Sequence, residues 1–237
     1  MRLNSSHWLL TKPIAHRGLW NNEIPENSLL AYDNAIKHGF PIEIDVHKSK
    51  DGVLFVFHDD NLKRLTGVDA LLHEKTSIEI KELFINGTEN KIPTLKETLE
   101  KVNGRVPLLI EIKNQPNDSI VEDTINMLKS YKGEFALQSF NHLYIIKIKK
   151  LAPEFIRGVL GTANTEKCGW LARLIIKNLS LNFLAKPDFI SYNIKNLPLK
   201  RKRRPPLLAW TITDQDMAKK AKALANNIIF EKFIPKI

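Results

Sequence analysis

Residues 43–60 read EIDVHKSKDGVLFVFHDD, a stretch with two apolar runs separated by a polar segment. Asp51 and Gly52 lie in that polar segment, and an Asp-Gly pair is typical of the tight turn of a β-hairpin. Only 13 positions separate Asp45 from His58, which is too short for a comfortable helical crossover between parallel strands. We therefore predict an antiparallel hairpin that returns His58 to within one position of Asp45.

The first arm of this hairpin is one of eight strand-like segments, and the second arm, at about residues 53–58, is an additional ninth. The eight are residues 13–18, 41–47, 106–113, 134–140, 155–161, 187–194, 207–213 and 227–233. Helical patterns lie between most of them, at residues 29–38, 95–102, 122–131, 142–151, 168–179 and 215–225. This alternation favours a (β/α)8 TIM barrel with an extra antiparallel hairpin strand over an open doubly wound sheet. No linker divides the chain, so we expect a single domain over residues 1–237.

Two helix starts carry capping residues. Thr94 followed by Glu97 is a capping box, and Asn27 or Ser28 can cap the helix that begins near residue 29.

The composition limits the class of protein. The 43% hydrophobic content supports a full-sized core, and the single cysteine, Cys168, excludes an internal disulfide framework or a cysteine-rich zinc site. No apolar run is long enough for a transmembrane helix, and the first residues lack the apolar core of a signal peptide, so we expect a cytoplasmic protein.

The net charge is +10, and part of it lies in the run Lys200, Arg201, Lys202, Arg203 and Arg204. This run is either a solvated loop or a surface for weak contact with an anionic membrane, and we expect no nucleic-acid partner.

Polar side chains follow or interrupt the apolar strands. His16 and His58 each follow an apolar run, so both histidines can meet at one end of a barrel. Glu43 and Asp45 alternate along one strand and therefore share a face, and Glu111 stands two positions before Lys113 on the next strand of the barrel.

Three carboxylates without a thiol favour one hard divalent cation, Mg²⁺ or Ca²⁺. The alternative is a structural ion network in which Glu43 pairs with Lys113 or Arg17.

Seven short motifs occur in a fixed order along the chain. They are His16-Arg17-Gly18, Pro25-Glu26-Asn27, Glu43-x-Asp45, His58-Asp59-x-x-Leu62-x-Arg64, Glu111-x-Lys113, Ser139-Phe140 and Trp210-Thr211. Together they resemble the glycerophosphodiester phosphodiesterases, and the resemblance extends from about Ile14 to Glu231. It implies metal-dependent hydrolysis of small-molecule glycerophosphodiesters to sn-glycerol 3-phosphate and an alcohol. It also implies a small insertion over the barrel mouth at residues 61–91, a candidate lid.

The resemblance assigns roles to individual residues. Glu43, Asp45 and Glu111 match the metal ligands, His16 and His58 the acid/base pair, and Arg17 and Lys113 the phosphate binders. Because the sequence does not separate acid from base, we take His16 as base and His58 as acid only as a working assignment.

Several neighbours of these residues are further candidates. Glu26 is expected to support the site as an acceptor for Arg17. Asn27 either belongs to the site as well or only caps the helix that follows. Ser139 and Trp210 are candidates for contact with glycerol or the leaving group, with a core position as the alternative for Trp210. His47 lies two positions after Asp45 and can also face the site.

One departure from the family pattern concerns the last strand. Residues 226–231 read NNIIFE where relatives commonly have Asp-Gly-Ile-Ile-Thr-Asp, so the fit of the substrate can differ. Glycerophosphocholine and glycerophosphoethanolamine are the expected substrates. A lysophospholipase D acting at a membrane surface is the second hypothesis, and a non-enzymatic binder of a phosphorylated ligand is the third.

Overall fold

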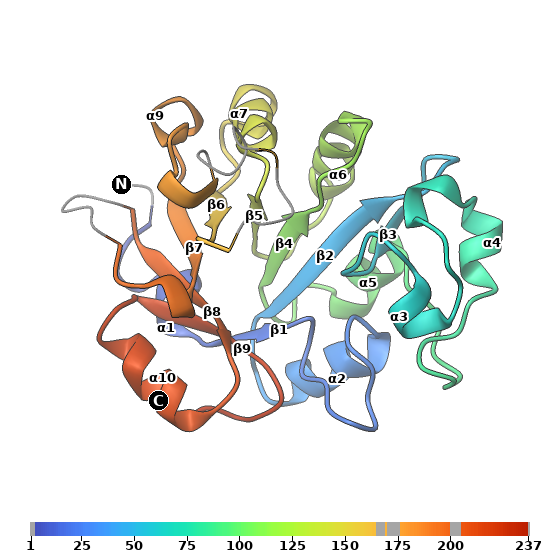
Figure 1. Cartoon of the computed structure of the whole chain (residues 1–237), viewed down its shortest axis with the longest axis horizontal. Helices are drawn as coiled ribbons and strands as arrows, with labels where there is room; N and C mark the ends of the chain where they lie inside the picture. Colours follow the sequence, from blue (N-terminus) through green and yellow to red (C-terminus); the bar gives the residue numbers. More distant parts are fainter. Residues whose placement is uncertain (1–2, 165–168, 170–175, 200–204, 237) are drawn as a thin grey trace.

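The computed structural model describes residues 3–164, 169, 176–199 and 205–236. Eight parallel strands form a closed barrel in the order β1-β9-β8-β7-β6-β5-β4-β2, and β2 pairs again with β1 (Figure 1). These strands are β1 (Ile14–His16), β2 (Ile42–Lys48), β4 (Leu108–Ile112), β5 (Phe135–Ser139), β6 (Arg157–Gly161), β7 (Phe189–Asn193), β8 (Leu207–Ile212) and β9 (Asn227–Phe230). The predicted (β/α)8 TIM barrel is confirmed.

Helices alternate with the strands and cover the outside of the barrel (Figure 1). The main ones are α2 (Leu29–Lys37), α5 (Leu95–Val102), α6 (Ser119–Leu128), α7 (His142–Leu151) and α10 (Gln215–Lys222). The shorter ones are α1 (Trp8–Thr11), α9 (Asn182–Ala185) and the 3-10 turn η2 (Ile194–Asn196). The helix expected over residues 168–179 lies mostly outside the described residues, as does the basic run 200–204. Among the helices of the described segments, none has the length and apolar character to cross a bilayer.

The extra strand is β3 (Leu54–Val56), which pairs antiparallel with β2. Val46 faces Val56 in this register, and the Phe57 amide donates to the Asp45 carbonyl at 2.9 Å. Position 45 therefore lies opposite position 57, within one residue of the prediction. The hairpin carries His58 back beside Asp45, in the middle of β2.

Both capping predictions can be compared with the structure. Thr94 and Glu97 form the capping box of α5. Ser28, and not Asn27, caps α2, because its hydroxyl accepts from the Ala31 amide at 3.2 Å. Asn27 has a positive φ of 50° and its side chain points to another partner, described below.

Apolar side chains fill the barrel interior near the amino-terminal ends of the strands, and α1 packs against them there. Trp8 and Leu9 of α1 pack with inward residues of six strands, among them Ile14 and Phe189. Asn227 of β9 fixes this segment, because its amide donates to the carbonyls of Leu9 at 2.9 Å and Lys12 at 2.6 Å. With that end closed, the open end lies at the carboxyl ends of the strands.

Residues 61–91 form a compact insertion beside β3 (Figure 1). The insertion contains α3 (Lys63–Thr66), the 3-10 turn η1 (Leu72–Glu74) and α4 (Ser77–Lys81). Its apolar side chains pack with Phe55 and Phe57 of the hairpin into a small separate core that includes Leu62, Leu72 and Ile80. This core anchors the segment that follows His58.

Candidate active site

Two neighbouring strands, β2 and β4, bring the predicted metal ligands together. Asp45 of β2 lies level with Glu111 of β4, and Glu43 lies level with His16 of β1. One oxygen each from Glu43, Asp45 and Glu111 lies within 4.8 Å of the others, and all three residues are buried. The donor set is all oxygen and without thiol, which suits a hard cation such as Mg²⁺ or Ca²⁺.

The cationic neighbours neutralise this cluster only in part. Lys113 Nζ lies 2.9 Å from Glu111 Oε1 and 3.4 Å from Asp45 Oδ1. Glu43 receives only the backbone N–H of Arg17, at 3.2 Å, and the edge of His16, at 3.9 Å, among the contacts of the described chain. Burial, with the charges of Asp45 and Glu111, raises the pKa of Glu43 well above its ordinary value. An ion network with Lys113 therefore exists, yet it leaves an excess of buried negative charge that fits a divalent cation.

Asp45 and Lys113 are held in their charged forms. Burial opposes ionisation of Asp45, but the combined charges of Lys113, His58, Arg17 and His16 lower its pKa. Burial likewise opposes protonation of Lys113, and the charges of Glu111 and Asp45 outweigh it and raise the pKa.

Asn27 orients Asp45 and is not a helix cap. Its amide donates to Asp45 Oδ2 at 3.0 Å, and its own oxygen accepts from the Tyr32 hydroxyl at 3.1 Å. All three side chains are buried. This chain of hydrogen bonds leaves the other oxygen of Asp45 directed toward Lys113 and the cluster.

The two histidines face each other across the cluster, with ring centroids 6.5 Å apart. His16 Nδ1 lies 2.7 Å from Glu231 Oε2, and His58 Nδ1 lies 2.6 Å from Asp59 Oδ1. A carboxylate at Nδ1 fixes the ring and leaves Nε2 available for proton transfer. Burial lowers the pKa of His16, although the hydrogen bond to Glu231 raises it in part.

Glu231 is a site residue that the sequence interpretation missed. It follows β9, and β9 pairs with β1 where the barrel closes, so the carboxylate reaches His16. The final acidic position of the family pattern is thus retained with one more methylene group. The signal in the sequence that could have indicated this role is a carboxylate directly after the last strand.

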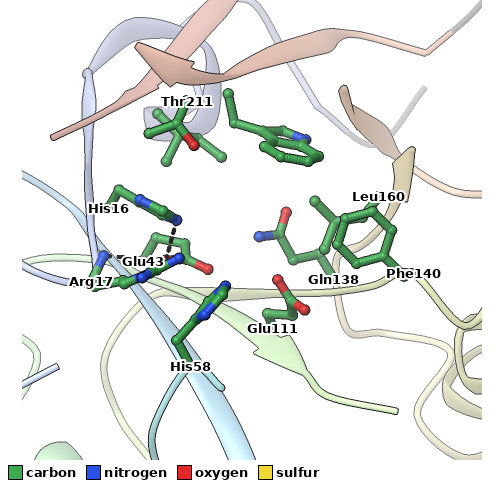
Figure 2. A pocket seen from close by; sticks show the side chains of 11 residues that line it. His16, Arg17, Glu43, His58, Glu111, Gln138, Phe140, Leu160 and Thr211 are labelled. Carbon is green, nitrogen blue, oxygen red and sulfur yellow. Dashed lines mark hydrogen bonds and ion pairs between the residues drawn. The ribbon is translucent and has the colours of Figure 1, made fainter. Parts of the chain in front are cut away.

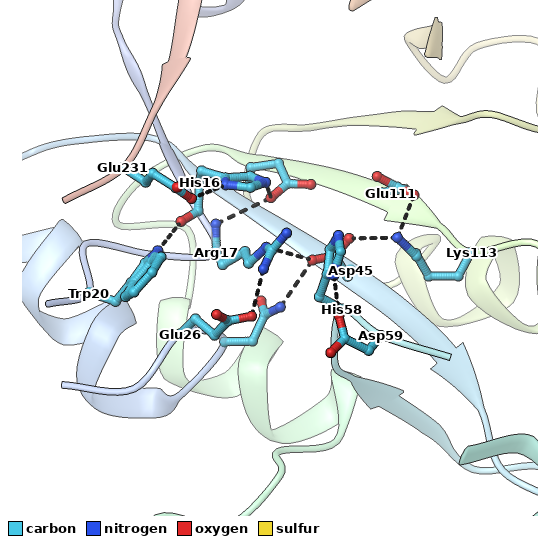
Figure 3. A network of polar contacts seen from close by, with 12 residues as sticks. His16, Arg17, Trp20, Glu26, Asp45, His58, Asp59, Glu111, Lys113 and Glu231 are labelled. Carbon is cyan, nitrogen blue, oxygen red and sulfur yellow. Dashed lines mark hydrogen bonds and ion pairs between the residues drawn. The ribbon is translucent and has the colours of Figure 1, made fainter. Parts of the chain in front are cut away.

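Arg17 leaves the barrel wall through a sharp turn. It has a φ of 59°, and Gly18 after it has a φ of 84° with Ala31 so close that a Cβ would lie 2.8 Å from the Ala31 Cβ. The turn aims the guanidinium at Glu26, 2.6 Å away, and at Asp45, 3.8 Å from Nε (Figure 3). Glycine is required at position 18 because of both this φ and this contact.

Glu26 and Arg64 connect the two sides of the site. Arg64 donates twice to Glu26, at 3.0 and 2.7 Å, and its Nε donates to Asp59. Glu26 therefore accepts from Arg17 and Arg64 together, as expected for a residue that supports Arg17. Through Asp59, the same arginine also holds the partner of His58.

An inner pocket opens beside these groups. Figure 2 shows His16, Arg17, Glu43 and His58 on one side of the pocket, with Gln138, Phe140 and Leu160 opposite and Glu111 beside Gln138. Trp210 also lines the pocket and meets Phe140 edge to face at 5.7 Å. Gln138 is a further lining residue that the sequence did not indicate; its oxygen accepts from the Ser191 hydroxyl at 2.7 Å.

Two candidate residues lie elsewhere. The Ser139 hydroxyl is buried, donates to the Ile112 carbonyl at 2.7 Å and accepts from the Asn141 amide, so it does not line the pocket. The expectation that Ser139 contacts substrate does not fit this geometry, because alternation along β5 turns Gln138 inward instead. His47 is buried with Nε2 at 3.4 Å from the His58 carbonyl, and burial, with Lys113, lowers its pKa to about 3. It therefore supports the loop that carries His58.

Comparison with known proteins places the chain in one family. The model of the glycerophosphoryl diester phosphodiesterase family matches residues 16–233. A glycerophosphodiester phosphodiesterase from Caldanaerobacter subterraneus is 32% identical over 236 residues, which cover 92% of this chain and 93% of the relative. A glycerophosphodiester phosphodiesterase from Bacillus subtilis is 27% identical over 233 residues, 85% of this chain and 76% of the relative.

Solved structures agree with this assignment. An Oleispira antarctica phosphodiesterase, in complex with the product sn-glycerol 3-phosphate, has a TM-score of 0.79 at 26% identity and covers 94% of this chain and 93% of its own. The glycerophosphodiester phosphodiesterase of Thermotoga maritima has a TM-score of 0.71 at 26% identity, with 92% of each chain covered. With its barrel, its acidic cluster and its paired histidines, the chain belongs to the glycerophosphoryl diester phosphodiesterase family.

Proposed function

We propose that this phosphodiesterase hydrolyses small glycerophosphodiesters, such as glycerophosphocholine and glycerophosphoethanolamine, to sn-glycerol 3-phosphate and an alcohol. One observation carries the proposal: two histidines, each with a carboxylate at Nδ1, flank a buried cluster of three carboxylates beside one pocket. The likeness to a phosphodiesterase in complex with sn-glycerol 3-phosphate supports the choice of product.

A phosphodiester is an anion that repels nucleophiles, so its hydrolysis needs positive charge around the non-bridging oxygens. Glu43, Asp45 and Glu111 would hold one Mg²⁺ or Ca²⁺, which supplies part of this charge when bound. Arg17 and Lys113 add a planar fork and a point charge for the same oxygens. Their acidic partners keep both cations in place before substrate arrives.

The histidines supply the proton transfers. His16 takes the proton of the nucleophile, which is water or the substrate's own glycerol 2-hydroxyl, and His58 protonates the departing alkoxide. Attack by the 2-hydroxyl gives a cyclic phosphate, which water then opens to sn-glycerol 3-phosphate. Glycerol fits the inner pocket, where Trp210 and Phe140 offer apolar faces for its carbon atoms and Gln138 offers an amide.

The test is release of glycerol 3-phosphate from both diesters by the purified protein with Mg²⁺, with Ca²⁺ or with a chelator. We expect turnover with one or both cations and none with the chelator. A protein that binds cation but is inert on both diesters would contradict the proposed substrates.

Hydrolysis of lysophospholipids is the second candidate. Human lysophospholipase D GDPD1 is 32% identical over 138 residues, 53% of this chain and 43% of that protein. Activity on lysophospholipid vesicles that disappears at high salt would favour it over the soluble substrates.

The Glu231→Gln variant tests the assignment of His16. Loss of the negative charge at Nδ1 is expected to lower the pKa of His16, because that charge stabilises the imidazolium. A base must be neutral, so the acidic limb of the kcat/KM profile should move to lower pH. Movement of the basic limb instead would make His16 the acid, and an unchanged profile with normal folding would remove His16 from proton transfer.

A further inference from the structure

A second pocket lies on the other side of His58. This outer pocket is lined by residues 58–61 and 63–64 together with Lys113, so the segment after β3 and the start of the insertion form most of its wall. His58 is the one lining residue that the inner and outer pockets share among the described residues. A substrate whose leaving-group oxygen lies at His58 can therefore extend from the inner pocket into the outer pocket.

The three cations of the outer pocket already have carboxylate partners. Those partners are Asp69 for Lys63, Glu26 and Asp59 for Arg64, and Asp45 and Glu111 for Lys113. The Lys63 pair is 2.8 Å long and exposed on both sides, whereas the other two belong to the support of the active site. None of these cations offers an unbalanced positive charge to a ligand.

Asp60 is the exception in this pocket. Its side chain is exposed, and its carboxylate has no hydrogen bond or ion pair with any residue in the described part of the chain. Only its backbone is engaged, since the carbonyl accepts from the Leu72 amide at 2.9 Å. This contact and the small core of the insertion hold Asp60 beside His58. The charge that the outer pocket leaves unbalanced is therefore negative.

We propose that the outer pocket receives the alcohol part of the diester and that Asp60 selects alcohols with a primary or quaternary ammonium group. The proposal rests on the proposed function, with His58 on the leaving-group side. An alcohol bonded to the oxygen at His58 then continues away from the inner pocket, toward Asp60. Electrostatic attraction between the carboxylate and the ammonium group would favour cationic over uncharged alcohols.

Steady-state kinetics of Asp60→Asn test this. The substrates are glycerophosphocholine and glycerophosphoethanolamine, with cationic alcohols, and glycerophosphoglycerol, whose alcohol is uncharged. We expect kcat/KM to fall about two- to fivefold for the two cationic substrates, the size typical of an exposed ion pair, and to stay unchanged for glycerophosphoglycerol. At about 1 M salt the difference between variant and wild type should disappear.

Glu89→Gln is the matched control. Glu89 is an exposed carboxylate of the same insertion that lines neither pocket, so its loss changes the net charge equally. It should leave all three substrates unaffected. An equal loss on all three substrates in Asp60→Asn, or no loss on any, would overturn the selection by Asp60. A wild-type protein inert on every diester would instead refute the proposed function itself, and the assignment of the outer pocket with it.

Discussion

Replacement of His58 by alanine is expected to lower kcat for glycerophosphocholine by about 10²- to 10⁴-fold, the usual contribution of a positioned acid or base. The variant should fold normally, because His58 is partly exposed and, of the residues that the structure describes, only Asp59 contacts its Nδ1. On the proposed assignment, its loss removes the proton donor, which lines both the inner and the outer pocket. Steady-state rates of glycerol 3-phosphate release measure the effect.

A second substrate makes the same variant diagnostic of the role. The p-nitrophenyl ester of glycerol 3-phosphate releases p-nitrophenolate, a leaving group that departs without help from an acid. If His58 is the acid, His58→Ala should lose far less activity on this ester than on glycerophosphocholine. His16→Ala should be equally impaired on both substrates, because the base acts on the nucleophile and not on the leaving group. The reverse pattern would exchange the two roles, and wild-type rates in both variants would refute the two-histidine mechanism.

The barrel was predictable because its strands are buried on both faces and therefore appear as uninterrupted apolar runs. β4, with five buried residues in succession, is such a strand. The hairpin register was predictable because the Asp51-Gly52 turn sets the pairing of β2 with β3. From these two facts follow the meeting of His58 with Asp45 and the shared face of Glu43 and Asp45.

The remainder depends on contacts between segments far apart in sequence. The short helix α1 has no clear periodicity, and its place under the barrel is decided by Asn227, more than 200 residues away. Glu231 reaches His16 only because β9 closes the barrel against β1. Asn27 and Ser28 both suit a helix cap. Their roles differ only because Asp45 lies where it can accept a hydrogen bond from the Asn27 amide. The local sequence pattern predicts the helices and strands. The long-range partners of these side chains are set only when the barrel closes.

Replacement of Glu43 by glutamine is expected to abolish cation-dependent turnover and, in the same protein, to spare the stability of the cation-free form. The two effects have one cause, the excess negative charge that Glu43 shares with Asp45 and Glu111. Glutamine keeps the shape and the contact with the Arg17 amide but removes one of three buried like charges. The cation-free variant should therefore melt at or above the temperature of the cation-free wild type.

Thermal melting with added cation separates a metal site from a structural ion network. Mg²⁺ or Ca²⁺ at 100 times its dissociation constant stabilises a folded protein by about 2.7 kcal/mol. For a chain of this size that corresponds to roughly 5–10 °C in Tm. The wild type should show this shift and Glu43→Gln should lose most of it. Glu231→Gln should retain it, because Glu231 contacts His16 and not the cluster.

The opposite pattern would identify a network in which the carboxylates serve only as partners of Lys113 and Arg17. In that case the cation would leave the wild-type Tm unchanged, and Glu43→Gln would melt below the wild type without any cation, because a charge that had been neutralised by its neighbours would be missing. The contacts favour the first pattern, since Lys113 reaches Glu111 and Asp45, but Glu43 receives no cationic side chain from the described segments closer than the edge of His16 at 3.9 Å. Glu43 is thus the carboxylate with the weakest partners. Its replacement should lower the stability of the cation-free protein least and that of the cation-bound protein most.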